Sequence, residues 1–152
     1  MHALALDMPF VEGETMDTNI NTAGMDDMKI RLSTLWIFVL FNMVYADIIS
    51  LMDPVAPIRR AMAGTPMSQG FLLTGAILME TSIAMVLLSR VLHHKANRWA
   101  NIIAGAINIV AVITGGPTSL YYIFFAAVEV VGMLFIIWFA WKWTNPEGQA
   151  RS

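Results

Sequence analysis

The run from Phe71 to Arg90 constrains this chain more than any other stretch of its sequence. The run is apolar almost throughout and holds one carboxylic acid, Glu80, near its centre. A helix that crosses the hydrocarbon core of a bilayer needs about 20 mainly apolar residues. An ionisable side chain inside such a helix costs at least ~2.5 kcal/mol on insertion scales, so its presence indicates a function by default.

Composition extends this interpretation to the rest of the 152 residues. Hydrophobic residues make up 57% of the chain and charged residues only 13%, whereas soluble domains carry about 25% charged residues. The net charge of −2 gives no basic surface for nucleic acid. The chain contains no cysteine, which excludes disulfides, thiolate metal sites and iron–sulfur clusters. We therefore expect no metal site and no cofactor.

Four apolar stretches predict an all-α integral membrane protein, a bundle of four transmembrane helices. The residues before it are acidic and include no Lys or Arg, which predicts a disordered N-terminal tail. The predicted boundaries are a tail over 1–28, a transmembrane domain over 29–145 with spans at about 32–52, 70–92, 99–116 and 120–143, and a short C-terminal tail over 146–152.

The connection between the first two spans predicts a short helix at the membrane interface. Asp53 can cap this helix, which would carry Arg59 and Arg60 and end at Gly64. Ser68 can cap the second span in the same way.

The distribution of Lys and Arg predicts the orientation of the bundle. Four spans put both termini and the basic loop 93–98 on one side of the membrane. That side holds seven basic residues, against two on the other side, Arg59 and Arg60. The positive-inside rule then places both termini in the cytoplasm, here of a bacterium with the protein in its inner membrane. The seven are Lys29, Arg31, Arg90, Lys95, Arg98, Lys142 and Arg151.

Each span has one conspicuous polar residue near its midpoint: Asn42, Glu80, Asn108 and Glu129 in chain order. We predict that these four side chains meet near the bilayer midplane and contact one another or one shared ligand. No Lys, Arg or His lies at that depth, and an isolated ionised carboxylate in hydrocarbon is too costly to persist. The two carboxyl groups are therefore protonated, share a proton or hold a cation. In the simplest alternative, each Asn bonds a protonated Glu and only holds the bundle together.

Two further polar residues of the first span, Tyr45 and Asp47, lie nearer its outer end. We assign them to the ligand site as the lining of an outer vestibule, with Arg59 or Arg60 opposite Asp47.

Two short sequence similarities complete the interpretation of the spans. The segment 41–44 (FNMV) echoes 107–110 (INIV), as expected if two helical hairpins arose by duplication. The run from Leu35 to Ile49 (LWIFVLFNMVYADII) resembles the first helix of an uncharacterised family of small bacterial four-helix membrane proteins. In general form the chain is also similar to the wider DoxX-like group. The resemblance implies a four-helix membrane fold over about 30–143 and no established activity.

These features favour a protein that sits among membrane lipids and binds or transports a small lipophilic or cationic ligand, with proton coupling through the carboxyl groups. Four helices make a thin pathway, which favours a homo-oligomer. One alternative is a membrane isomerase or cyclase with Glu80 and Glu129 as general acid and base on a lipid or isoprenoid. Another is a structural subunit of a larger membrane complex. The sequence leaves open whether the chain is an enzyme.

Overall fold

A computed structural model describes residues 10–115 and 119–143, with side chains from Gly24 onward. Within these residues the chain is helical, and four helices are long and apolar enough to cross a membrane. This confirms the predicted all-α bundle of four spans. The helices are α1 (Phe10–Ser50), α2 (Pro57–Met62), α3 (Gln69–Val91), α4 (His94–Gly115) and α5 (Leu120–Lys142).

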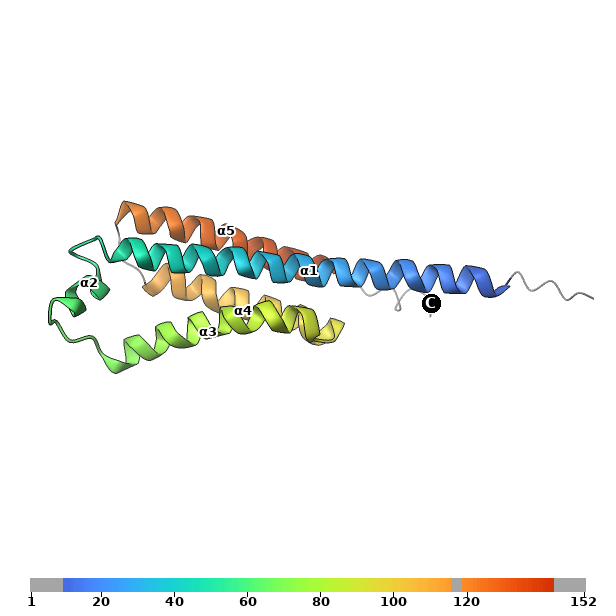
Figure 1. Cartoon of the computed structure of the whole chain (residues 1–152), viewed down its shortest axis with the longest axis horizontal. Coiled ribbons are helices and arrows are strands. Elements are labelled where there is room, and N and C mark those ends of the chain that lie inside the picture. Colours follow the sequence, from blue (N-terminus) through green and yellow to red (C-terminus); the bar gives the residue numbers. More distant parts are fainter. Residues whose placement is uncertain (1–9, 116–118, 144–152) are drawn as a thin grey trace, which may run out of the picture.

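The four long helices pack as a ring in which neighbours run antiparallel. Helix α1 packs against α3 and α5, and α4 packs against the same two helices. Helices α1 and α4 therefore occupy opposite corners of the bundle. Figure 1 shows that α3 leans away from α1 towards the end of the molecule where α2 lies.

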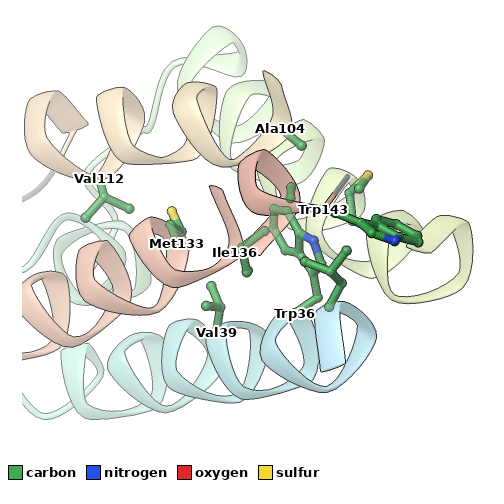
Figure 2. Close-up of a cluster of buried hydrophobic side chains, with 10 residues drawn as sticks. Trp36, Val39, Ala104, Val112, Met133, Ile136 and Trp143 are labelled. Carbon is green, nitrogen blue, oxygen red and sulfur yellow. The ribbon is translucent and has the colours of Figure 1, made fainter. Parts of the chain in front are cut away.

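The apolar core lies where α1, α4 and α5 meet. Figure 2 shows Trp36 and Val39 of α1 directed towards Ile136 of α5, and all three side chains are buried. A Cβ atom on Gly132 would lie 2.9 Å from Cγ2 of Val39. Glycine at this position lets α1 and α5 approach closely, which is how helices in lipid gain packing energy.

At the N-terminal end, α1 begins at Phe10 and runs for 41 residues. It therefore enters the stretch 1–28, for which a disordered tail stays the sequence prediction. At ~1.5 Å per residue such a helix is about twice as long as the hydrocarbon core is thick. Figure 1 shows its N-terminal part extending beyond the other helices.

This extension has a simple physical cause. The sequence holds no proline between Phe10 and Asp53, and each residue added to an existing helix gains a hydrogen bond without a new nucleation step. Asp27 and Arg31, four residues apart, form an exposed ion pair at 3.2 Å that adds a little support. Residues 1–9 and the predicted tail 146–152 lie outside the described residues.

The connection between α1 and α3 contains the predicted short helix, but with a different start. Helix α2 begins at Pro57 with Ala56 as its N-cap residue, while the Asp53 carboxylate accepts a hydrogen bond from the Val55 N–H at 2.9 Å. Asp53 thus closes a turn before the helix. Gly64 follows the helix with φ of 95°, a left-handed conformation that favours glycine. The Ser68 cap is confirmed, because its Oγ accepts from the Phe71 N–H at 3.2 Å.

The connection between α3 and α4 is shorter than predicted. We expected a solvated loop over 93–98, but α4 begins at His94. Asn97, inside the expected loop, is fully buried. Hydropathy marks only the apolar part of a spanning helix, and the polar residues here form its first turn.

Candidate functional site

Asn42 and Glu129 form the one direct contact among the four predicted midplane residues. The Asn42 side-chain amide donates to Oε1 of Glu129 at 3.1 Å and to the Phe125 carbonyl at 3.1 Å. Glu129 is only 5% exposed, in the middle of a membrane-spanning helix. The hydrogen bonds join α1 to α5 at the same level as the close approach at Gly132.

Asn108 of α4 lies at the level of Glu129 in the interface between α4 and α5. A Cβ atom on Gly105 of α4 would lie 3.8 Å from the Met133 carbonyl of α5, which fixes the alignment of these two helices. Asn108 follows Gly105 by three residues and Glu129 precedes Met133 by four. Residues three and four apart share a helix face, so Asn108 and Glu129 occupy the next layer of the α4–α5 interface.

Both N–H groups of the Asn42 amide and one of the two of the Asn108 amide donate to described residues, while one buried oxygen of the site accepts no hydrogen bond from them. The Asn108 side-chain amide donates to the Ala104 carbonyl of its own helix at 2.9 Å. Its Oδ1 is buried and accepts no hydrogen bond from the residues that the structure describes. Buried polar groups are nearly always hydrogen-bonded, so this oxygen requires a further donor, which a protonated carboxyl group or a ligand with N–H groups can supply.

Glu80 does not join this site, and the prediction that all four side chains converge is wrong for this residue. The depth was right: Ser82 Oγ donates to Met43 Sδ at 3.8 Å, which puts the middle of α3 level with Asn42. The predicted direction of the Glu80 side chain was wrong. Glu80 is exposed and points away from the buried residues of α3, Ser82, Met85 and Ser89, from which it lies about 140–200° around the helix.

Tyr45 and Asp47 lie between Asn42 and the end of α1 that leads to α2, and their surroundings differ from those predicted. The Tyr45 ring contacts Phe125, with 5.8 Å between ring centroids, next to the carbonyl that Asn42 binds. Asp47 is exposed and forms no ion pair with Arg59 or Arg60 in the part of the chain described here. The expected pairing across an outer vestibule is therefore absent.

A second polar cluster lies near the connection between α3 and α4, and sequence reasoning missed most of it; we call it the cytoplasmic cluster after the predicted orientation. Trp36 Nε1 of α1 donates to Oδ1 of Asn101 at 2.7 Å, and Ser89 Oγ of α3 donates to the same oxygen at 3.2 Å. The Asn101 amide donates to Oδ1 of Asn97 at 2.6 Å, and the Asn97 amide donates to the Ser89 carbonyl at 2.6 Å. All four residues are fully buried.

Ser33 adds a second polar link between α1 and α3. Its Oγ donates to the Val86 carbonyl at 2.9 Å and accepts from Arg90 Nε at 3.0 Å. The donors and acceptors of the cytoplasmic cluster satisfy one another, so we interpret it as a structural network. The sequence did hold a signal for it. Asn97 and Asn101 are four residues apart, and Ser82 and Ser89 are seven apart, spacings that repeat on one helix face.

Aromatic side chains pack the start of α4 against the end of α5. The His94 and Trp143 rings meet edge to face with 4.6 Å between centroids, so this histidine is packed rather than solvated. The Arg98 guanidinium lies 5.3 Å from the Trp141 ring, and Lys142 Nζ lies 4.4 Å from the Trp138 ring. Within the described residues no three His, Cys, Asp or Glu side chains gather as a metal site would require.

Comparison with known families gives one match, which covers residues 23–149. The chain belongs to DUF6326, a family of unknown function. The match includes all four spans and every residue of the candidate site. The DUF6326 assignment confirms the predicted membership of an uncharacterised family, and no finding links the chain to the DoxX-like group. No curated protein and no solved structure matches the chain.

Proposed function

We propose that this membrane protein binds a small lipophilic cation at the Asn42–Glu129 site and exchanges it for a proton on Glu129. The observation behind the proposal is a buried carboxyl at mid-membrane depth whose only side-chain donor among the described residues is a neutral amide, Asn42. Buried charges are normally paired, and the described part of the bundle places no Lys, Arg or His at this depth. A bound proton or a bound cation can supply the missing charge.

The chemistry of the free atoms favours a ligand with N–H groups. Asn42 directs both amide hydrogens to Glu129 and to the Phe125 carbonyl, and Asn108 directs one to the Ala104 carbonyl. The Glu129 carboxyl and the buried Asn108 Oδ1 then remain as acceptors. Charge-assisted hydrogen bonds from a cationic donor to a carboxylate are the strong class of such bonds.

Comparison with the cytoplasmic cluster argues against a purely structural role for this site. In that cluster, Trp36, Ser89, Asn97 and Asn101 satisfy one another. At the midplane site, an acceptor stays unpaired beside an acid. A glutamine at position 129 would hold the helices together equally well at a lower insertion cost. The carboxyl group of Glu129 therefore has a function that an amide would not provide.

The alternative in which two glutamates act as general acid and base loses support. It requires Glu80 and Glu129 on one substrate, whereas Glu80 lies on the outer face of α3. Asp47, which is exposed five residues further towards the outer end of α1, is instead placed to attract a cation towards Glu129.

The test uses ethidium, a permanently charged, fluorescent lipophilic cation with two amino groups. The full chain is reconstituted into liposomes with an acidic interior, and uptake of ethidium is followed. We expect uptake above that of protein-free liposomes, and loss of this uptake in Glu129→Gln. Glu80→Gln is the matched control, because it makes the same chemical change at the same depth outside the site, and it should transport like the wild type.

Two results would overturn the proposal. One is equal ethidium uptake by the wild type and Glu129→Gln. The other is equally strong competition by tetraphenylphosphonium, a lipophilic cation without N–H groups, because the free acceptors of the site would then have no role in recognition.

We also propose that both termini face the cytoplasm of a bacterial cell. The support is the excess of seven Lys and Arg residues over two on the opposite side of the four spans. In this orientation, α2 with Arg59 and Arg60 lies at the outer surface, and protons reach Glu129 from the side of Asp47.

A further inference from the structure

Glu80 poses a physical problem that the single chain does not solve. It is exposed at the middle of a spanning helix and makes no hydrogen bond or ion pair with any residue that the structure describes. Ionisable residues in membranes almost always face a protein interior or a water-filled cavity, because lipid contact is costly. The outer face of α3 therefore needs a covering that this chain does not provide.

Helix α3 is also the least packed of the four spans. In the stretch of 18 residues that makes α3 apolar enough to span a membrane, only 11% is buried inside the protein, against 28% in the corresponding stretch of each of the other three spans. All of its buried residues, Ser82, Met85 and Ser89, lie in its second half. Figure 1 shows the first half leaning away from α1. This helix has the most surface left for another partner.

The uncovered face has the spacing of a helix–helix contact. Six residues follow one another in alternating steps of four and three, the 3.5-residue repeat by which two helices pack along their length. Ala84, one turn from Glu80, is small and leaves room for a close neighbour. We name this face the α3 seam: Leu73, Ile77, Glu80, Ala84, Leu87 and Val91, of which all but the half-buried Ala84 are exposed.

We propose that the α3 seam binds the α3 seam of a second copy of this chain, with the two Glu80 side chains paired at the centre. Copies inserted with the same topology are related by a two-fold axis along the membrane normal. In such an isologous interface, Glu80 necessarily meets Glu80 of the second copy at the same depth.

The chemistry of the pair is self-complementary. A protonated carboxyl group has one O–H donor and a free acceptor oxygen, so two of them satisfy each other without a countercharge. Hydrogen bonds between helices are one of the forces that hold transmembrane helices together. A different protein would have to bring a suitable group to this depth, whereas a second copy brings it by symmetry.

Cysteine cross-linking tests the seam directly, because the chain has no cysteine of its own. Ile77→Cys and Ala84→Cys are each expressed in the full chain and oxidised in native membranes. We expect a disulfide-linked product of twice the 16.9 kDa chain mass. Ile107→Cys, on an exposed position of α4, is the matched control and should give little of this product.

Adding Glu80→Leu to either seam variant should reduce the cross-linked product to the control level, although leucine is more apolar and the residue is exposed. Glu80→Gln should retain it, because an amide is also both donor and acceptor. Seam cross-linking no greater than in Ile107→Cys, cross-linking that Glu80→Leu does not reduce, or a product with a different protein would each overturn the proposal. Glu129→Gln should leave the product unchanged, so the outcome is separate from that of the transport test.

Discussion

The indole of Trp36 and the side chain of Asn101 join opposite corners of the bundle through a 2.7 Å hydrogen bond. Their helices, α1 and α4, otherwise meet mainly through the shared neighbours α3 and α5. Both residues are fully buried. A hydrogen bond between diagonal helices fixes the rotation of both, and so fixes which side chains of α1 and α4 face the midplane site.

The first prediction concerns this link. Asn101→Leu should lower the free energy of unfolding in detergent by about 1–2 kcal/mol, because it removes the partner of the Trp36 N–H, of the Ser89 hydroxyl and of Asn97 Oδ1. Trp36→Phe removes one donor and should cost less than Asn101→Leu. Unfolding by a denaturing detergent measures both values. An Asn101→Leu protein as stable as the wild type would show that the cluster does not hold the corners together.

The second prediction concerns the close approach of α1 and α5. Gly132→Leu should prevent the native packing, because even a Cβ atom there lies 2.9 Å from Val39 and overpacking typically costs about 1–3 kcal/mol. Gly75→Leu is the matched control, since nothing lies within 4 Å of a Cβ atom on Gly75. Thermal unfolding in detergent should show a large loss of stability for Gly132→Leu and almost no loss for Gly75→Leu. Similar losses in both would contradict the packing described here.

The third prediction is that Asn42 and Glu129 are energetically coupled. A double-mutant cycle with Asn42→Leu and Glu129→Leu should give a coupling energy of about 0.6 kcal/mol or more, the range seen for hydrogen bonds between membrane helices. The same cycle with Asn42→Leu and Glu80→Leu should be additive, because Glu80 points away from α1. Additivity in the first cycle would mean that the 3.1 Å contact contributes nothing to stability.

The fourth prediction concerns orientation. Single cysteines at Thr65 and Ala96, both exposed, can be treated with a membrane-impermeant thiol reagent in intact cells. We expect labelling of Thr65→Cys alone, because seven basic residues against two place the Ala96 side in the cytoplasm. Labelling of Ala96→Cys alone would reverse the topology.

The spans and their depths follow from the sequence because they depend on length and hydropathy alone. Asn42 and Glu129 were expected to meet, and they do. Glu80 shows what length and hydropathy do not predict. Its depth is a property of its own helix, but the direction it faces depends on how α3 rotates against its neighbours. That rotation is set by Ser82, Met85 and Ser89, whose alignment no apolar pattern reveals in a helix that is hydrophobic on all sides.

The ends of helices were harder to predict for a related reason. The apolar stretch of a span ends where polar residues begin, but the helix itself extends beyond that stretch. Helix α4 therefore begins at His94 and α1 at Phe10, before the apolar residues that predict them. The cytoplasmic cluster was missed because a tryptophan in a membrane helix is usually assigned to the interface, whereas Trp36 is fully buried and donates to Asn101.

The central claim is that Glu129 binds a proton in the absence of ligand and releases it to a cation. Infrared difference spectroscopy from about pH 5 to about pH 9 tests this claim most directly, because a protonated carboxyl group has its own absorption band. We use Glu80→Gln as the background, because it removes the paired Glu80 carboxyl groups, and predict such a band near neutral pH that is absent when Glu129→Gln is added and that disappears when ethidium binds. A band that persists when Glu129→Gln is added, or that ethidium does not affect, would contradict the account.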